Sequence, residues 1–379
     1  MSMFDFAVIG AGMAGVSFAA RVARRASVLV LEREPLLAYH STGRSAAVFD
    51  SLYGNDTIRS LTRASRGFYD SPPHGFAEHP LLTTRGQIHL IGDDDRGSEH
   101  HLVASPPAET ISIAEAIARV PILRGDTFAY AILESNACDV DVHATYQGFL
   151  RMAKAAGATV VTNVELRSLE RRGNWRIETS SGNYKAATLV NAAGAWADEL
   201  AHLAGANPLG LTPLRRTAIN VDPPPGLDVT NWPCVVAADE SFYFKPDAGR
   251  LLASPADETP STPCDAQPDE FDIAVCVDRL ERATTLSIHR VVHSWAGLRT
   301  FAADRTPVVG YDPHCEGLFW LAGQGGYGIQ TAPALSEVAA ALALGESIPS
   351  HIVAEAFTPA AVLPARLLEA VSAGWRSIV

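Results

Sequence analysis

The sequence predicts an α/β fold in which a Rossmann-like dinucleotide-binding domain is interleaved with an α+β substrate domain built on an antiparallel sheet. Three observations carry this prediction. Residues 4–31 read as strand, glycine turn, helix and strand; two later blocks are rich in short strands and turns; and helical periodicity returns between and after these blocks. The dinucleotide domain is therefore assigned to residues 1–80, 139–208 and 293–379, and the substrate domain to residues 81–138 and 209–292.

The first strand and its glycine turn predict a nucleotide-binding site. Phe6–Ile9 is a short apolar run typical of a buried parallel strand, and the alanine-rich segment Ala14–Arg25 is predicted to be a helix. Gly10 permits a sharp turn, Gly12 lets the backbone approach a pyrophosphate, and Gly15 lets the helix pack close to the strand. The alternative is a small-residue turn that binds nothing, which the flanking strand and helix disfavour.

The second strand ends in an acid that narrows the choice of nucleotide. Val28–Leu31 is apolar, and Glu32 follows it, about 20 residues beyond the glycines. A carboxylate at this position accepts hydrogen bonds from ribose hydroxyls and repels a ribose phosphate. The sequence therefore favours FAD or NAD over NADP.

Composition excludes several classes of function. The 379-residue chain has a formal net charge of −12 and no basic tract, which argues against a nucleic-acid partner. Its five cysteines contain no Cys-x-x-Cys pair, so we expect reduced thiols and a cytoplasmic protein. No metal site is predicted, because the adjacent His100 and His101 lie in a polar loop and are expected to be solvated. Neither a leader nor a membrane span is expected.

Apolar spacing and proline or glycine breakers predict the remaining elements in order. Ile58–Tyr69 is an amphipathic helix followed by Pro72, and Ala114–Val120 is a short helix that Pro121 stops. The other predicted helices are Asp139–Ala155, Ala195–Ala204, Phe271–Ala283 and Gln330–Leu344. The predicted strands are Gly86–Ile91, Asp126–Leu133, Thr159–Val161, the hairpin of Trp175–Glu178 and Tyr184–Ala186, Leu189–Gly194, Leu214–Val221, Val235–Ala237, Ser241–Lys245, Leu251–Ser254 and Leu318–Ala322. Residues 92–98 and 259–270 are predicted surface loops.

The segment Tyr39–Ala47 is small and polar, with a single arginine, Arg44. It reads as a loop that enters a short helix. Its backbone donors and the Arg44 guanidinium are suited to a second phosphate of the nucleotide. An ordinary helix cap would look the same, so both readings stay open.

Four segments together resemble the family of FAD-dependent D-amino-acid oxidases. They are the opening glycine motif, Ser41–Ala47, Val190–Ala197 and Gly323–Gly328. The similarity spans nearly the whole chain and is greatest to the bacterial D-arginine dehydrogenase and D-amino-acid dehydrogenase group. It implies a glutathione-reductase-type FAD domain and the oxidation of a D-amino acid to a 2-oxo acid through the imino acid, by hydride transfer from the α-carbon to flavin N5.

The resemblance also implies the positions that contact the cofactor. Val164 would lie beside the adenine, although on sequence alone it is plain core. The FAD is expected to be non-covalent, because the stretches that match the family's attachment points read Arg44-Ser45-Ala46 and Leu298-Arg299-Thr300. The full set is Gly10, Gly12, Ala14, Gly15, Glu32, Arg33, Ser41, Thr42, Arg44, Ser45, Ala46, Ala47, Val164, Ala193, Gly194, Trp196, Gly325, Gly326, Tyr327, Gly328, Ile329 and Gln330.

Oxidation of an amino acid by a flavin requires a fixed carboxylate and a neutral amine. By resemblance, Arg216 and Arg299 bind the carboxylate, where a planar guanidinium gives two parallel hydrogen bonds. The resemblance places the Tyr243 hydroxyl beside them and Tyr53 in a lid over the substrate. Strand alternation sends the neighbouring Arg215 to the opposite face. Gly326 and Gln330 match positions near the substrate amine and the flavin.

Two departures from the family pattern bear on the substrate side chain. D-arginine dehydrogenases carry a carboxylate where this chain has Gln87 and a histidine where it has Val48. A neutral amide cannot supply the ionic hydrogen bonds that hold a guanidinium. Asp50 would compensate if it turned inward, but loop acids usually face water. The sequence thus predicts broad or neutral side-chain specificity.

Two other functions stay open. A flavin enzyme of the same fold could oxidise sarcosine, proline, an opine or 2-hydroxyglutarate, and a non-catalytic FAD-binding subunit would need neither Arg216 nor Arg299. Expected partners are the small substrate and an electron acceptor, which is a quinone, a carrier protein or O2. The chain is expected to be a monomer or a homodimer.

Overall fold

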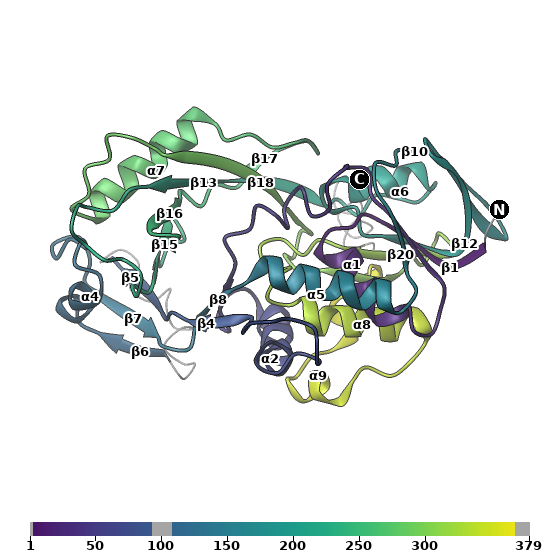
Figure 1. Cartoon of the computed structure of the whole chain (residues 1–379), viewed down its shortest axis with the longest axis horizontal. Helices are drawn as coiled ribbons and strands as arrows, with labels where there is room; N and C mark the ends of the chain where they lie inside the picture. Colours follow the sequence, from purple (N-terminus) through teal and green to yellow (C-terminus); the bar gives the residue numbers. More distant parts are fainter. Residues whose placement is uncertain (1–2, 93–107, 368–379) are drawn as a thin grey trace, which may run out of the picture.

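The computed structural model describes residues 3–92 and 108–367, and these residues form three β-sheets with helices packed against them (Figure 1). One large sheet, sheet A, contains the N-terminal strand. A second large sheet, sheet C, occupies the other end of the molecule. A small sheet lies between them and consists of β3 (Val48–Phe49), β8 (Cys138–Val140) and β4 (Leu82–Thr84).

Sheet A has a parallel centre flanked by antiparallel strands. The order β12-β1-β2-β9 is parallel, and β20 adds to β12 in parallel, whereas β10, β11 and β19 run antiparallel to their neighbours. Its strands are β1 (Met3–Ile9), β2 (Val28–Leu31), β9 (Thr159–Val161), β10 (Leu166–Arg172), β11 (Asn174–Thr179), β12 (Gly182–Asn191), β19 (Val308–Tyr311) and β20 (Leu318–Ala322).

Both faces of sheet A are covered, which explains the continuous apolar run in β1. Phe6 and Val8 enter one core with α1 (Met13–Val22), α5 (Val142–Ala155) and α8 (Ala332–Leu344). Ala7 and Ile9 point to the other face, where α6 (Ala197–Leu203) packs. Alternate residues of one strand thus stabilise two separate cores.

Sheet C is mainly antiparallel, with one parallel pair between β14 and β5. Its strands are β5 (Gln87–Ile91), β6 (Ala108–Ile111), β7 (Tyr130–Glu134), β13 (Thr212–Val221), β14 (Cys234–Ala237), β15 (Tyr243–Asp247), β16 (Arg250–Ser254), β17 (Thr259–Pro260) and β18 (His293–Phe301). Helices α4 (Ile113–Arg119) and α7 (Glu270–Ala283) pack against it. The remaining elements are α2 (Asp56–Asp70), α9 (Ser350–Ala354) and the 3-10 turns Gly194–Trp196 and Pro359–Ala361.

The predicted α/β fold class is confirmed, with local corrections. The predicted helix from Asp139 begins only at Val142, because residues 138–140 form β8 and Asp141 caps the helix by accepting from the Ala144 N–H at 2.7 Å. The strand predicted from Asp126 begins at Tyr130, and residues 194–196 form a 3-10 turn instead of the end of a strand. The edge strand β10 was missed since its charged sequence lacks apolar alternation.

The strand β18 pairs with β13 along its whole length, so sheet C continues past residue 293 to Phe301. The predicted domain division is otherwise still a prediction. Most of the predicted loop 92–98 and the pair His100 and His101 lie outside the described residues. No helix within residues 3–92 and 108–367 has the length and apolar character needed to cross a membrane.

Candidate active site

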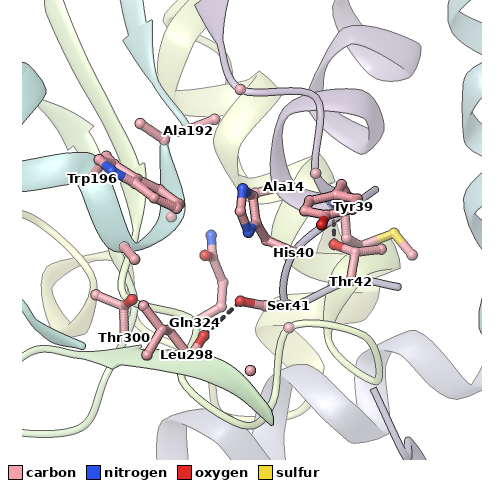
Figure 2. A pocket seen from close by; sticks show the side chains of 18 of the residues that line it. Ala14, Tyr39, His40, Ser41, Thr42, Ala192, Trp196, Leu298, Thr300 and Gln324 are labelled. Carbon is pink, nitrogen blue, oxygen red and sulfur yellow. Dashed lines mark hydrogen bonds between the residues drawn. The ribbon is translucent and has the colours of Figure 1, made fainter. Parts of the chain in front are cut away.

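A cavity of about 420 Å³ lies where the β1–α1 turn of sheet A meets the end of sheet C (Figure 2). Its walls come from the glycine turn, the loop after β2, the 3-10 turn after β12, strand β18 and the glycine-rich turn after β20. These are the segments on which the sequence predicted a nucleotide site. Figure 2 shows side chains from several of them converging on one space.

In the glycine turn, backbone segments pack so closely that two of the glycines have no room for a side chain. Gly10 has a φ of +103°, and a Cβ there would lie 2.4 Å from the Ala192 carbonyl oxygen. A Cβ on Gly15 would lie 2.0 Å from the Gly10 carbonyl oxygen. A Cβ on Gly12 would meet only Thr42 Oγ1, at 3.4 Å, so Gly12 leaves open space at the cavity wall. The three glycines therefore serve the turn, the helix packing and the approach of a ligand.

The N-terminus of α1 is open to an anion. Its cap residue Gly12 has no side chain to accept the first N–H groups, and among the described residues the Met13 N–H donates to Thr42 Oγ1 at 3.0 Å. Glu32 Oε2 accepts from the Ala11 N–H at 2.8 Å, while the carboxylate also lines the cavity. A phosphate at the helix N-terminus and a ribose at Glu32 both fit this arrangement.

Arg44 lines the cavity, but its guanidinium already has protein acceptors. Its Nη1 donates to the carbonyl oxygens of Ala266 and Ala296, each at 2.9 Å, and its Nη2 pairs with Asp265. The nearby Ser41 hydroxyl donates to the Leu298 carbonyl at 2.5 Å (Figure 2). These bonds join the loop that carries Arg44 to residues 265–266 and to strand β18, and a contact of Arg44 with a phosphate stays a prediction.

Most of the predicted cofactor positions lie on this cavity. Those lining it are Gly10, Gly12, Ala14, Glu32, Arg33, Ser41, Thr42, Arg44, Ser45, Ala46, Val164, Ala193, Gly194, Trp196, Gly325, Gly326, Gly328 and Ile329. Four others are absent from the described cavity wall: Gly15, Ala47, Tyr327 and Gln330. Their contacts with a cofactor stay predictions.

The structure adds wall residues that the sequence analysis did not single out. His40 lies beside Trp196, with ring centroids 4.8 Å apart (Figure 2), and the Arg33 guanidinium lies 4.2 Å from the Trp196 ring centroid. Leu298, Thr300 and Gln324 also line the cavity. Each lies within a few residues of a predicted site position, and proximity in sequence was the only signal for them.

Two arginines meet on neighbouring strands at one end of the cavity. Arg216 of β13 stands opposite Gly297 of β18, and Arg299 stands opposite Leu214, so the two arginines are diagonal neighbours on one face of the sheet. Both line the cavity, as does Tyr243. A Cβ on Gly326 would lie 2.9 Å from an Arg299 guanidinium nitrogen, which brings the glycine-rich turn against this end.

The two arginines differ in what they bind. Arg216 donates to the Asp257 carbonyl oxygen at 2.9 Å and to Glu258 Oε1 at 3.1 Å. Arg299 makes no hydrogen bond or ion pair with any residue in the described part of the chain. Burial lowers the pKa of Arg216, with the charge of Arg299 acting in the same direction. Arg299 is thus an unpaired cation facing the cavity, where an anionic group would stabilise it.

The predicted orientation of Arg215 is confirmed. It lies on the opposite face of β13 and donates to Asp272 Oδ2 of α7 at 2.8 Å. A second carboxylate, that of Asp269, lies 3.6 Å away. Arg215 therefore joins α7 to the sheet.

Tyr53 lies near the arginine pair. Its ring centroid is 4.9 Å from that of Tyr327, and burial raises the pKa of Tyr53 to about 12 while the charge of Arg299 acts in the opposite direction. Among the described residues Tyr53 does not line the cavity itself. It packs against a cluster of three buried side chains, those of Ile58, Phe301 and Tyr327.

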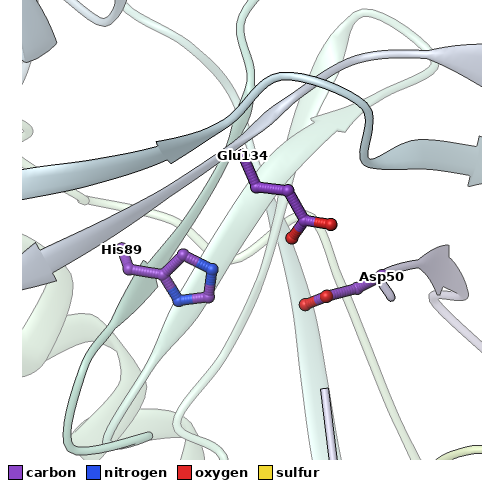
Figure 3. Close-up of side chains that lie close together, drawn as sticks. All are labelled: Asp50, His89 and Glu134. Carbon is purple, nitrogen blue, oxygen red and sulfur yellow. The ribbon is translucent and has the colours of Figure 1, made fainter. Parts of the chain in front are cut away.

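The positions predicted to contact the substrate side chain form a buried polar cluster. Asp50 points inward, contrary to the expectation for a loop acid: its Oδ2 accepts from Gln87 Nε2 at 2.6 Å and its Oδ1 from the Leu52 N–H at 2.7 Å. His89 and Glu134 complete this group (Figure 3). Burial and the charge of Asp50 raise the pKa of Glu134 to about 9.

Gln330 connects this cluster to the glycine-rich turn. Its Oε1 accepts from the Asp50 N–H at 3.2 Å, and its Nε2 donates to Thr62 Oγ1 at 2.9 Å. Val48 lies in β3 and pairs with Asp139. Neither Val48, Asp50 nor Gln87 is among the described residues that line the cavity, so their predicted contact with a substrate side chain stays a prediction.

Comparisons with known proteins identify the family of the chain. Residues 5–342 match the family described as "DAO: FAD dependent oxidoreductase". Glycine oxidase of Geobacillus kaustophilus is 24% identical over 356 residues, which cover 87% of this chain and 90% of that protein. N-methyl-L-tryptophan oxidase of Salmonella enteritidis is 23% identical, covering 91% of this chain and 95% of its own.

The solved structures show the same fold. The crystal structure of the Geobacillus kaustophilus glycine oxidase superposes with a TM-score of 0.80 at 21% identity, covering 92% of this chain and 96% of that one. L-proline dehydrogenase from P. horikoshii superposes with a TM-score of 0.75 at 21% identity, covering 91% and 95%. These relatives support the family as a whole and do not single out the D-arginine dehydrogenase group.

Proposed function

The chain belongs to the DAO family of FAD-dependent oxidoreductases, and we propose that it oxidises the α-carbon–nitrogen bond of an amino acid with a neutral side chain, D-amino acids in the first place. The observation that carries this proposal is the unpaired Arg299 on the cavity wall, diagonal to Arg216. A pure nucleotide-binding protein has no use for a second, unpartnered guanidinium at the far end of its cavity from the glycine turn.

The residues present fit FAD. The open space at Gly12, the uncapped start of α1 and the Glu32 carboxylate suit the pyrophosphate and the ribose. Val164 lines the cavity near Leu31 and Leu166, in keeping with an adenine there. When bound, FAD would accept the hydride, a hydrogen with its electron pair, from the substrate α-carbon. The absence of a histidine or cysteine at the predicted attachment points favours non-covalent binding.

The arginine pair would fix the substrate carboxylate. Arg299 supplies a bidentate, charge-assisted contact, and Tyr243 adds a hydroxyl on the same side of the cavity. Arg216 already donates to the Asp257 carbonyl oxygen and to Glu258. It therefore contributes mainly its positive charge to the carboxylate site, and few free hydrogen-bond donors. A carboxylate held in this way has its α-carbon directed to one place, which is the positional part of catalysis.

The glycine-rich turn would orient the amine. Gly326 lies against Arg299, so its backbone is within reach of a group attached to the carbon beside the carboxylate. A backbone carbonyl there would accept a hydrogen bond from the neutral amine and so direct the lone pair of the amine nitrogen toward the bond that breaks. No side chain is needed as a nucleophile.

The hydrogen bonds of the Asp50 carboxylate favour a substrate with a neutral side chain. Its carboxylate oxygens accept from Gln87 and from the N–H groups of Leu52 and Tyr53. Asp50 is also absent from the described cavity wall, so its carboxylate offers no ionic partner there to a guanidinium or an ammonium. Gln87, with its amide turned to Asp50, offers no charge.

A second candidate is the oxidation of glycine or an N-substituted amino acid. It is favoured by the relatives, which are named as acting on glycine and N-methyl-L-tryptophan. The same carboxylate contact serves these substrates. The electron acceptor, whether a quinone, a carrier protein or O2, is a separate property that depends on access to the flavin.

Anaerobic flavin bleaching tests the proposal. The purified protein is mixed with D- and L-amino acids, glycine, N-methyl amino acids and 2-hydroxy acids in the absence of oxygen. Fast bleaching by neutral D-amino acids is the expected result, with D-arginine slow. Bleaching only by glycine or N-methyl amino acids would select the second candidate, and bleaching by none of the panel would contradict amino-acid oxidation.

A further inference from the structure

We propose that Asp50, His89 and Glu134 bind a divalent transition-metal ion, of the class to which Zn²⁺ belongs, at a site in sheet C that is separate from the flavin cavity. No metal site was predicted from the sequence, in which these three residues lie in distant segments that no spacing pattern links. The structure brings one ligand atom from each to within 4.8 Å of the others.

Three elements converge to build this site (Figure 3). His89 comes from β5 and Glu134 from the adjacent antiparallel strand β7, where Gln87 is paired with Glu134. Since residues 87 and 89 share one face of β5, the imidazole and the carboxylate are diagonal neighbours. Asp50 reaches them from the loop after β3.

An unpaired atom in the cluster points to a cation. Glu134 is fully buried, with 0% of its surface exposed, and its Oε2 receives no hydrogen bond from any described residue. Among the described residues, its other oxygen, Oε1, accepts from the Ser51 hydroxyl at 3.2 Å. The carboxylate of Asp50, 5% exposed, faces it. Two buried carboxylates beside each other are costly unless a proton or a metal ion lies between them.

The donor set selects the class of ion. One imidazole nitrogen and two carboxylate oxygens are ligands typical of Zn²⁺, with room for a fourth ligand, whereas Ca²⁺ and Mg²⁺ prefer oxygen alone. Two ionised carboxylates and a neutral imidazole also balance the charge of a divalent ion. Gln87 Nε2 donates to Asp50 Oδ2 at 2.6 Å, so the amide fixes the orientation of the Asp50 carboxylate.

The burial of the three residues, away from the cavity wall, favours a small ion as their ligand over the side chain of a substrate. Asp50, His89 and Glu134 are each at most 7% exposed, and none is among the described residues on the cavity wall. A metal ion needs no channel of the width that an amino-acid side chain requires.

The proposed ion would fasten the segment that carries Tyr53. Asp50 Oδ1 accepts from the N–H groups of Leu52 and Tyr53, and Ser51 binds Glu134. An ion held by Asp50 therefore fixes residues 50–53 to sheet C, next to the arginine end of the cavity. An effect of the ion on substrate KM rests on the proposed function, but binding of the ion does not.

The test is Zn²⁺ binding to the flavin-containing protein. The protein is treated with a chelator, dialysed and titrated with Zn²⁺ by calorimetry, with thermal unfolding as a second readout and no substrate present. We expect one ion per chain and a raised Tm, with no comparable response to Mg²⁺. Glu134→Gln and His89→Gln should each weaken Zn²⁺ binding by roughly 10- to 100-fold or more.

A matched control separates this site from adventitious binding. His351 and Glu337 form a more exposed pair, 3.4 Å apart, and His351→Gln should leave the titration unchanged. If one of the cluster variants does not fold with its flavin, the other provides the comparison. Failure of the wild-type protein to bind Zn²⁺, or binding by the cluster variants that is as tight as that of the wild type, would overturn the proposal. So would competition for the site by D-arginine, which would assign the cluster to a cationic substrate.

Discussion

The two ends of the cavity are built on opposite principles. At the sheet A end, the cavity wall is formed by backbone, and the glycines Gly10, Gly12 and Gly15, which lie within one short stretch of the chain, leave room because they have no side chains. At the sheet C end, the contacts come from charged side chains on separate strands, among them Arg216 and Arg299. The first end is encoded by spacing along the chain and the second by tertiary structure.

This difference also sets what each end tolerates. The glycine turn is sensitive to any added atom, because its neighbours are main-chain atoms that cannot move aside. The arginine end is sensitive to the loss of charge, because Arg299 has room around it and no described partner of its own. Substitutions at the two ends should therefore fail in different ways.

The largest effect is expected at the glycine turn. Gly15→Ala puts a Cβ 2.0 Å from the Gly10 carbonyl oxygen, so the turn and helix α1 must separate. Overpacking of this kind costs about 3 kcal/mol at the upper end of its usual range. If this free energy is lost from the FAD-binding conformation of the turn, FAD binding becomes more than 100-fold weaker. The protein should purify largely without flavin, as measured by the ratio of flavin absorbance to protein.

The control for this substitution is another helical glycine. Gly67 lies inside α2, with nothing within 4 Å of an added Cβ. Gly67→Ala should keep its full flavin content and gain up to about 1 kcal/mol of stability from helix propensity. Equal flavin loss in both variants would mean that the Gly15 contact is not what matters.

The next largest effect concerns the arginine end. Arg299→Met removes the proposed carboxylate contact, with an expected cost of about 2–5 kcal/mol in transition-state binding. This corresponds to roughly a 30- to 5,000-fold fall in the kcat/KM of flavin reduction. Flavin content should not change, and the free energy of unfolding should not fall, since an unpaired and partly buried cation is removed.

Arg215→Met is the matched control. Arg215 is the same residue type on the opposite face of β13, paired with Asp272. Its loss should lower stability and leave the kinetics of flavin reduction close to those of the wild type. If Arg299→Met reduced its flavin as fast as the wild type, the arginine end of the cavity would not be where the substrate carboxylate binds.

A smaller effect is expected at Gln330, which connects the two regions. Gln330→Ala removes its bonds to the Asp50 N–H and the Thr62 hydroxyl, and it leaves the buried Asp50 N–H without this acceptor, while the Thr62 hydroxyl still donates to the Ile58 carbonyl. Denaturant unfolding should show a loss of about 1–3 kcal/mol. The exposed Gln267 is the control, and Gln267→Ala should change stability by less than about 0.5 kcal/mol. Equal stability of the two variants would show that Gln330 does not hold the Asp50 loop.

The smallest effect is expected at Tyr53. Because burial raises the pKa of Tyr53 to about 12, the phenol should stay neutral over the assay range of about pH 6 to 10. Tyr53→Phe should change kcat/KM by no more than about tenfold, the worth of a single hydrogen bond. It should leave the shape of the pH profile intact. Loss of a basic limb in the variant would show that Tyr53 ionises within that range.

The sequence predicted the sheet A end well because its signals are local. The run Phe6–Ile9, the glycines and Glu32 lie within one βαβ unit, and each was found where the pattern placed it. The charged edge strand β10 and the short β8 before α5 carry no comparable period, so sequence patterns could not find them.

The sheet C end could be predicted only in part. Resemblance to the family located Arg216, Arg299 and Tyr243 on the cavity, but the pairing of Arg216 and the isolation of Arg299 depend on Asp257 and Glu258, which no pattern linked to them. The inward turn of Asp50 was missed for the same reason. Its partners Gln87, His89 and Glu134 meet only when β5 and β7 pair.

The central claim is that Arg299 binds a substrate carboxylate, and the most direct measurement leaves the protein unchanged. The rate of anaerobic flavin reduction is compared for one amino acid that bleaches the flavin and for its carboxamide, which keeps the amine and the α-hydrogen. We expect the carboxamide to reduce the flavin at least roughly 30-fold less efficiently, in line with the loss expected for Arg299→Met. Equal efficiency for the two compounds would contradict carboxylate binding by Arg299.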